Sequence, residues 1–167
     1  SRSYLVYVPE SYNPSVPTPL VISIHGFAEW PAHQMQLSRW NDLADQYGFI
    51  VVYPSGMQFP RRWRTYGAPG SATDPMLDVT FISDLIDTLS AEYNLDPARI
   101  YANRLSNGGV MSFVLSCQLS ERIAAIGSRI RSPYCTSMIR SSPCLSRKSI
   151  ARSACCALSR RFRLRAF

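Results

Sequence analysis

Ser106 is the residue of this sequence whose surroundings point most directly to chemistry. It follows an apolar run at residues 100–102 and precedes Gly108-Gly109, a pattern that predicts a sharp turn between a strand and a helix. Such a turn lifts a serine hydroxyl clear of the sheet, where it can attack a carbonyl carbon. We therefore predict that Ser106 is a nucleophile. The alternative is that Ser106 is only the N-cap of the helix that follows.

The turn departs from the usual G-x-S-x-G motif at one position. The residues two before and two after the serine should be small, because chain segments crowd there. Gly108 meets this requirement, whereas Arg104 replaces the first glycine of the motif. Holding a bulky residue in a strained turn costs on the order of 1–3 kcal/mol, so we expect strain at Arg104.

A second group of residues predicts donors for the oxyanion that forms when a serine attacks a carbonyl. His25-Gly26-Phe27 directly follows the apolar run at residues 20–24. We expect the backbone N–H groups of Phe27 and Asn107 to point at the developing negative charge. Gly26 lets the main chain approach a substrate closely. His25 is interpreted as a residue that fixes the loop rather than as the base.

The sequence offers no obvious base for Ser106. A nucleophilic serine needs a base that takes its proton and an acid that orients the base. The histidines of the sequence, His25 and His33, both precede the serine, and Glu121 is the sole acidic residue after it. The segment around His33 predicts an ordinary surface loop, so His33 is a poor substitute. We therefore expect little or no turnover.

Aromatic and basic side chains suggest a substrate site near these residues. Four residues are predicted to contact the substrate: His25, Gly26, Trp30 and Trp63. Phe27 and Tyr66 could extend an acyl or aryl pocket, and the alternative is that these rings only pack the loops. The three arginines between residues 61 and 64 could meet an acidic substrate, and the alternative is a solvated loop.

These residues must be positioned by strands and helices that alternate through residues 1–127. Strands are expected at residues 4–8, 20–24, 49–53, 99–102 and 123–126, and helices at residues 36–47, 78–93 and 108–119. Residues 57–77 contain proline and glycine without periodicity and predict a surface loop. The alternation predicts an α/β fold with a mainly parallel sheet and helices on both faces.

The composition changes abruptly at residue 128. Residues 1–127 hold 8 arginines and 11 acidic residues, for a net charge of −3, whereas residues 128–167 hold 10 basic residues and no acid. The later segment also lacks glycine and valine and shows no hydrophobic period. We interpret residues 1–127 as the N-terminal part of a folded domain. Residues 128–167 are interpreted as a basic Ser/Arg/Cys-rich tail that is out of frame or disordered.

Two other interpretations of the tail are weaker. A basic arm could contact nucleic-acid phosphates, but its arginines are scattered and few aromatic residues lie among them. Its cysteines, Cys135, Cys144, Cys155 and Cys156, form no C-x2-C pair and have no histidine nearby. We therefore expect neither a metal nor a nucleic acid as a partner. No run of 18 apolar residues exists, so no membrane-spanning helix is expected.

Five segments carry a resemblance to a known family: residues 23–27 (SIHGF), 52–56 (VYPSG), 78–79 (DV), 93–101 (YNLDPARIY) and 105–109 (LSNGG). On these segments, residues 3–127 resemble the N-terminal part of the polyhydroxybutyrate depolymerase-like esterases. This branch of the α/β-hydrolases includes feruloyl and acetylxylan esterases. The last two segments together are quite specific, whereas each of the others alone is a weak signal.

The resemblance implies extracellular hydrolysis of a small or polymeric carboxylic ester by a Ser-Asp-His triad, without a metal or a cofactor. It implies that Ser106 is the nucleophile and that Phe27 and Asn107 supply the oxyanion donors. It offers no matching position for the acid or the base, and Arg104 and Val110 depart from the turn of the family. We therefore expect a truncated α/β-hydrolase, a serine esterase with impaired activity. The alternatives are a non-catalytic remnant and a nucleic-acid binder that uses the basic tail.

Overall fold

The structure is a computed structural model, and it describes residues 2–129. The strands are β1 (Tyr4–Tyr7), β2 (Thr18–Ser23), β3 (Ile50–Pro54), β4 (Leu95–Leu105) and β5 (Ala125–Arg129). The helices are α1 (Pro31–Ser38), α2 (Trp40–Tyr47), α3 (Met76–Glu92) and α4 (Ser106–Gln118). The tail predicted from residue 128 begins too early, because Ser128 and Arg129 belong to β5 and pair with β4. The rest of the predicted tail, from residue 130 on, lies outside the described residues.

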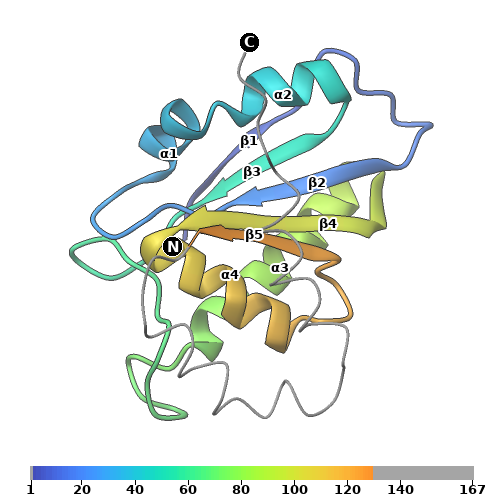
Figure 1. The fold of residues 1–167 in the computed structure, drawn as a ribbon. Coiled ribbons are helices and arrows are strands. Elements are labelled where there is room, and N and C mark those ends of the chain that lie inside the picture. The colour runs from blue at the N-terminus through green and yellow to red at the C-terminus, as the bar shows by residue number, and fades with distance from the viewer. Residues whose placement is uncertain (1, 130–167) are drawn as a thin grey trace. The chain divides into compact units, whose positions relative to one another are not determined.

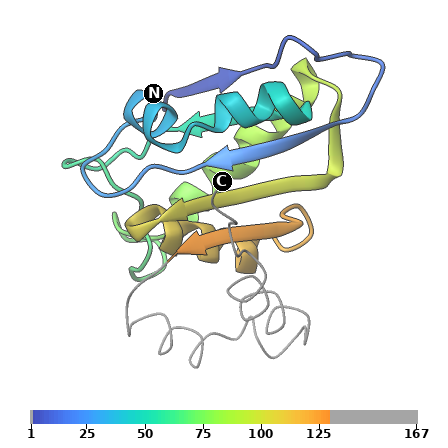
Figure 2. The ribbon, with the colours of Figure 1, turned by 45° about the horizontal axis from the view of Figure 1, so that its top comes forward.

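The five strands form one sheet in the order β1-β3-β2-β4-β5. Strands β2, β3, β4 and β5 run parallel, and β1 pairs with β3 in the antiparallel sense. The predicted mainly parallel sheet is therefore confirmed. From β2 the chain moves to one side to form β3 and later to the other side to form β4. The carboxyl ends of the parallel strands lie at one end of the sheet (Figures 1 and 2). Because the chain leaves β2 toward opposite sides of the sheet, this end offers a place for a ligand.

Helices cover both faces of the sheet, as the alternating pattern predicted (Figure 1). Side chains alternate between the faces along each strand, so Leu20 and Ile22 of β2 join one cluster and Val21 the other. The larger cluster contains the apolar stripes of α3 and α4. The smaller cluster contains Ala44 of α2 with Val21 and residues of β3. The sheet is therefore held from both sides, which fixes the loops at its edge.

The single helix expected at residues 36–47 is wrong in one respect, because the structure forms two helices there. Arg39 separates α1 from α2 and has φ of 52°, in the left-handed region. Its N–H donates to the carbonyl oxygen of Met35 at 3.3 Å and so ends α1. A left-handed residue usually shows in a sequence as glycine, as at Gly48, which ends α2. No such signal stands at residue 39.

Strand β4 is longer than expected at both ends. The sequence predicted a strand at residues 99–102 because Asp96-Pro97 suggested a break. The structure keeps these residues within β4 and places the irregularity in the pairing, which shifts register between Thr18 and Leu20 of β2. Proline lacks an N–H for the ladder, and such an irregularity accommodates it. The extension carries β4 directly to Ser106.

Candidate active site

Strand β4 ends and helix α4 begins without an intervening loop, and Ser106 stands at the junction. Its φ is 61°, in a region that residues other than glycine rarely adopt and that costs about 1–3 kcal/mol. An N-cap residue normally has an extended backbone, so the observed φ favours the strained turn over a simple cap. The predicted strand–turn–helix layout is therefore present. The role of Ser106 as nucleophile stays a prediction.

The first turn of α4 lies against the end of β2 with no room for a side chain at Gly108. A Cβ atom on Gly108 would lie 2.5 Å from the carbonyl oxygen of His25 and 2.6 Å from that of Ile24. Both distances are far shorter than any normal contact of a Cβ atom. Gly108 therefore permits a close approach between the serine turn and the loop after β2, as the motif predicted.

Arg104 occupies the position where the usual motif has a glycine. The strained backbone lies at Ser106, whereas Arg104 is not among the residues with positive φ. The Arg104 side chain is 9% exposed and forms an ion pair with Glu29, whose Oε2 also accepts a hydrogen bond of 2.7 Å from the Gly26 N–H. The bulky residue is therefore accommodated by a partner far away in sequence, and strain specific to its backbone is not seen.

His25 is fully buried and holds the loop after β2 in place. Its Nε2 accepts a hydrogen bond of 2.8 Å from the Gly56 N–H, so the ring proton belongs on Nδ1, which donates to the carbonyl oxygen of Gly26 at 2.7 Å. Burial lowers the pKa of His25 below its ordinary value and favours the neutral ring. Both ring nitrogens are engaged, which agrees with the interpretation of His25 as a loop-fixing residue and leaves no nitrogen for Ser106.

Trp63 joins the two segments that carry the predicted oxyanion donors. Its indole N–H donates to the carbonyl oxygen of His25 at 2.9 Å. Its backbone N–H donates to Oδ1 of Asn107 at 2.7 Å, and Nδ2 of Asn107 donates to its carbonyl oxygen at 3.2 Å. The indole is 1% exposed, so it packs and bonds within the protein instead of lining a surface. The sequence predicted Trp63 as a substrate contact, and pattern reasoning missed this bridging position.

Phe27 and Asn107 lie at the carboxyl ends of neighbouring strands. The register pairs Ser23 of β2 with Asn103 of β4, and each predicted donor follows its strand residue by four positions. Phe27 is 51% exposed. Ala28, which follows it, has φ of 56° and donates its N–H to the carbonyl oxygen of Arg61 at 2.7 Å. The structure thus brings the two donor segments to one edge, and their role stays a prediction.

Trp30 and His33 lie beside each other at the start of α1. Trp30 directly precedes the helix and is 53% exposed, so its ring remains available to a ligand. The surface loop expected around His33 is wrong, because His33 lies within α1. Its ring centroid is 5.5 Å from that of Trp30, and its Nδ1 is buried without a hydrogen-bond partner among the described residues. His33 therefore packs against Trp30 at the beginning of the helix.

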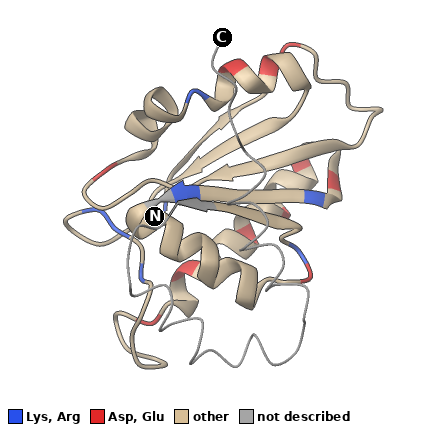
Figure 3. Cartoon of the chain, in the orientation of Figure 1, with Lys and Arg blue, Asp and Glu red and all other residues tan. Residues whose placement is uncertain are grey.

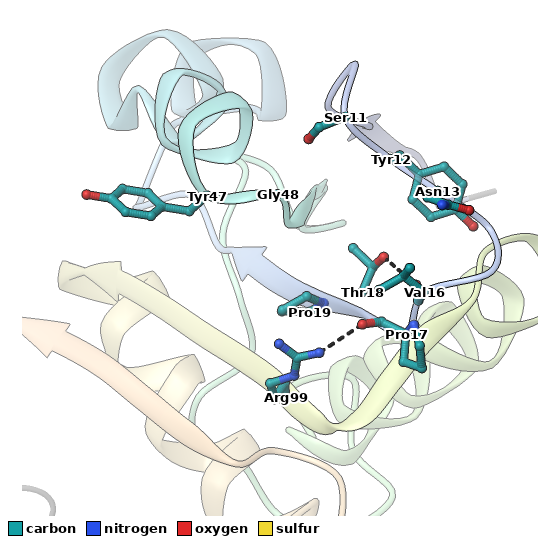
Figure 4. Close-up of a pocket in the computed structure, with 10 residues that line it drawn as sticks. All are labelled: Ser11, Tyr12, Asn13, Val16, Pro17, Thr18, Pro19, Tyr47, Gly48 and Arg99. Carbon is teal, nitrogen blue, oxygen red and sulfur yellow. Dashed lines mark hydrogen bonds between the residues drawn. The ribbon is translucent and has the colours of Figure 1, made fainter.

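A hollow of about 390 Å³ lies at the other, amino-terminal end of β2 (Figure 4). Thr18, Gly48 and Arg99 are among the residues that line it, and Arg99 donates to the carbonyl oxygen of Pro17 at 2.8 Å. The residues predicted from the sequence as catalytic or substrate-binding are absent from its lining. This hollow is therefore separate from the candidate active site.

No helix among residues 2–129 is long and apolar enough to cross a membrane. No group of three or more histidine, cysteine, aspartate or glutamate side chains in that range is placed to hold a metal ion.

Comparison with known families gives one match that covers most of the chain. A family model described as Esterase PHB depolymerase matches residues 2–158. The match includes the whole described part and continues beyond residue 127, where the composition changes.

Curated relatives match a shorter range of the chain than the family model does. The chain is 34% identical over 124 residues to a bifunctional acetylxylan esterase/xylanase of Neocallimastix patriciarum. The matched residues make up 74% of this chain and 17% of that protein. The chain is also 29% identical over 133 residues to poly(3-hydroxyalkanoate) depolymerase C of Paucimonas lemoignei. This match makes up 77% of this chain and 32% of that protein. The chain thus spans less than half the length of these relatives.

Solved structures agree on the fold. An acetyl xylan esterase from Aspergillus awamori has a TM-score of 0.63 at 23% identity, over 74% of this chain and 44% of that chain. A thermostable esterase has a TM-score of 0.57 at 27% identity, over 74% of this chain and 35% of that chain. With the mainly parallel sheet and its two helical layers, these neighbours show a fold of the α/β-hydrolase type, as expected.

Proposed function

We propose that Ser106 accepts the acyl group of an ester. The chain belongs to the Esterase PHB depolymerase family, and its ancestry is that of carboxylic-ester hydrolases. The observation that carries the proposal is the positive φ of Ser106 between β4 and α4. The close approach at Gly108 supports it, because this contact fixes the serine turn against the loop that bears Phe27. The backbone N–H groups of Phe27 and Asn107 are the proposed oxyanion donors.

The proposed reaction proceeds through an acyl-enzyme. Oγ of Ser106 forms a bond to the carbonyl carbon of the ester, and negative charge gathers on the carbonyl oxygen near the two N–H groups. The bond to the alkoxy oxygen then breaks, and the alcohol leaves with a proton. Water attacks the acylated serine in a second step, which releases the carboxylic acid and restores the hydroxyl group.

Proton transfer is the weak step of this proposed reaction. The two nitrogens of His25 are engaged, His33 packs beside Trp30 in α1, and no histidine follows Ser106 in the sequence. We therefore propose that in the present chain the serine proton passes to solvent. Enzymes that lose members of the triad retain roughly 10³–10⁴-fold acceleration over water through the oxyanion hole and binding. We propose that the present chain works in this range.

The substrate class is proposed from the relatives and from physical access. The names of the relatives refer to acetylxylan and to poly(3-hydroxyalkanoate), both of them polymers that carry ester groups. We infer that this chain acts on a small ester or on the ester groups of a polymer, without a metal or a cofactor in the reaction. We also propose an extracellular place of action, which the similarity to these enzymes supports.

The test is a search for the acyl-enzyme. The full chain is incubated with nitrophenyl acetate, and the acetylated peptide is identified by mass spectrometry. Slow proton transfer also slows deacylation, so we expect the acetyl group to accumulate on Ser106. Ser106→Ala should lose the label, whereas Ser116→Ala should keep it, because Ser116 lies in the same helix with its hydroxyl bonded to the Phe113 carbonyl oxygen. Equal labelling and equal ester hydrolysis in Ser106→Ala would contradict the proposal.

A further inference from the structure

A hollow of about 600 Å³ opens beside the loop that bears the proposed oxyanion donor Phe27. Its walls come from the segments that follow β2 and β3, and among its lining residues are Ala28, Trp30, Met57, Phe59 and Arg61. The Ala28 N–H donates to the Arg61 carbonyl oxygen at 2.7 Å, which ties the two walls together. Both segments leave the carboxyl edge of the sheet, where β4 delivers Ser106. The hollow therefore adjoins the proposed active site.

Three large apolar side chains that line the hollow are exposed to solvent. Trp30 is 53% exposed, Met57 is 47% exposed and Phe59 is 95% exposed. The sequence places these residues in two separate loops, and the fold gathers them around one hollow. When a ligand covers exposed apolar surface that is gathered in this way, the burial contributes favourably to the free energy of binding. Aromatic walls favour a flat or apolar ligand body.

The same hollow holds a positive charge that carboxylates of the described part do not balance. Eight arginine side chains are described, and six of them pair with a carboxylate: Arg2, Arg39, Arg64, Arg99, Arg104 and Arg122. The remaining two, Arg61 and Arg62, are neighbours in the loop between β3 and α3, where Figure 3 shows basic residues. Among the described arginine side chains, those without a carboxylate partner are thus neighbours in one loop.

The partners of these two arginines are neutral. Nη1 of Arg61 donates to Oγ of Ser55 at 2.7 Å and to the carbonyl oxygen of Gly56 at 3.2 Å. Nε of Arg62 donates to Oε1 of Gln58 at 2.6 Å. The bonds to Ser55 and Gly56 fix the Arg61 guanidinium at the wall of the hollow and leave its charge uncompensated. A carboxylate on a ligand would supply the missing negative charge through a charge-assisted hydrogen bond.

We propose that this hollow binds the non-reacting part of an ester that has an apolar or aryl body and ends in a free carboxylate. The body lies against Trp30 and Phe59, and the carboxylate meets Arg61. The proposal deepens the proposed function, because it names the class of ester that the site at Ser106 takes. It concerns binding alone, so it can be measured whether or not the chain turns over an ester.

The experiment compares two small probes that differ in charge. The full chain is titrated with 3-phenylpropanoate and with the uncharged 3-phenylpropanamide, and binding is followed by tryptophan fluorescence and by calorimetry. We expect the carboxylate to bind on the order of tenfold more tightly than the amide, a difference that should shrink as salt is raised. Trp30→Phe should remove most of the fluorescence change while calorimetry still detects binding.

Variants assign the charge effect to the hollow. Arg61→Gln should reduce the affinity for the carboxylate to that for the amide, and Arg61→Lys should restore part of the difference. Arg39→Gln is the matched control, because Arg39 is an exposed arginine between α1 and α2, and it should leave both affinities unchanged. Circular dichroism checks that Arg61→Gln is folded. If Arg61→Gln is not folded, Phe59→Ala provides a second test, because Phe59 lines the hollow and is 95% exposed, and this variant should bind both probes more weakly.

Three results would overturn the proposal. They are no binding of either probe, equal affinity for the carboxylate and the amide, and full charge selectivity in a folded Arg61→Gln protein. If Arg61→Gln does not fold, unchanged binding of both probes to Phe59→Ala takes the place of the third result. Each can occur while Ser106 still accepts an acetyl group from nitrophenyl acetate. Conversely, an unreactive Ser106 together with selective carboxylate binding would reject the proposed reaction and leave this binding site standing.

Discussion

The chemistry proposed for this chain depends on how closely the first turn of α4 approaches the end of β2. Gly108→Ala would place a methyl group 2.5 Å and 2.6 Å from two backbone carbonyl oxygens. Backbone gives way less readily than a flexible side chain, so we expect the free energy of unfolding to fall by about 1–3 kcal/mol or more. Acylation of Ser106 should fall with it. Denaturant unfolding and mass spectrometry measure the two effects.

Gly127→Ala is the matched control for this substitution. A Cβ atom on Gly127 would meet the Asn103 Cβ at 3.4 Å, an ordinary contact distance. We expect its unfolding free energy to stay within about 0.5 kcal/mol of the parent chain. If Gly108→Ala proved as harmless as Gly127→Ala, the close approach of the serine turn to the loop after β2 would be refuted.

His25 should make stability depend on pH near neutrality. Burial lowers its pKa in the folded state below about 6.5, its ordinary value, which the unfolded chain keeps. Between these two values the unfolded chain binds more protons than the folded one. The free energy of unfolding should therefore fall as the pH drops through this window, by up to about 1.4 kcal/mol per pH unit.

The measurement is denaturant unfolding of the parent chain and of His25→Gln at several pH values between about 7.5 and 5.5. The variant should be less stable at the upper end, because the glutamine does not reproduce both hydrogen bonds of the imidazole. Its stability should nevertheless change less with pH, since the titrating ring is gone. Parallel pH profiles of the two proteins would show that His25 is not the source of the dependence.

At the residue scale, sequence reasoning works where a backbone requirement selects one residue type. The need for glycine at position 108 follows from the motif, and the atoms that a Cβ would meet confirm it. The ion pair of Arg104 with Glu29 spans 75 positions, so no local pattern contains it. The arginine therefore suggested strain from the sequence, whereas the fold supplies a partner.

At the scale of elements, the loop between β3 and α3 is the part that organises the candidate site. Trp63→Phe would remove the indole donor from the His25 carbonyl oxygen and leave that buried acceptor without this bond. We expect a loss of about 1–3 kcal/mol in unfolding free energy. Amide hydrogen exchange should become faster in the loop after β2, which loses the indole bond. The start of α4 should change less, because Asn107 bonds the backbone of residue 63, which the variant keeps.

Trp40→Phe is the control that separates the loss of the Trp63 hydrogen bond from the loss of a tryptophan ring elsewhere in the protein. Trp40 packs edge-on against Phe49, with ring centroids 5.8 Å apart, in the smaller cluster on the other face of the sheet. Exchange at the loop after β2 should be unaffected in this variant. If both variants changed exchange there equally, Trp63 would have no special part in joining the two donor segments.

The elements themselves were largely predictable because hydrophobic patterns are local. The stripe Val79, Ile82, Leu85, Ile86 and Leu89 is buried as the helical period requires, although α3 begins at Met76. The break at Arg39 and the continuation of β4 through Pro97 were not predictable. Both are decided by packing and by pairing with β2, which a window of sequence does not contain.

At the scale of the whole molecule, we propose that the residues after β5, from residue 130 on, form a part separate from the hydrolase domain. The sheet and the site contacts described above lie within residues 2–129. A chain that ends at residue 130 should therefore keep its near-ultraviolet circular dichroism and a single cooperative unfolding transition. The family match that reaches residue 158 makes this deletion informative. Loss of the transition would mean that the later segment belongs to the domain.

The charge difference between the two parts gives the deletion a second readout. Residues 128–167 carry a net charge of +10, against −3 for residues 1–127. If the tail binds nucleic acid, the affinity of the full chain for a DNA oligonucleotide should fall steeply as the salt concentration is raised. The chain that ends at residue 130 should then not bind the oligonucleotide. Undiminished binding after the deletion would exclude the basic tail as a nucleic-acid contact.

The hydrogen bonds of Trp63 also determine when the site can form as the chain folds. They link it to His25 across 38 positions and to Asn107 across 44, so long loops must close before these bonds exist. Closing such loops costs conformational entropy, and contacts between distant residues slow folding. The pairing of β2 with β4 joins residues that are still farther apart in the sequence, such as Leu20 and Ile100. We therefore expect this strand pairing and the geometry of the serine turn to form together late in folding.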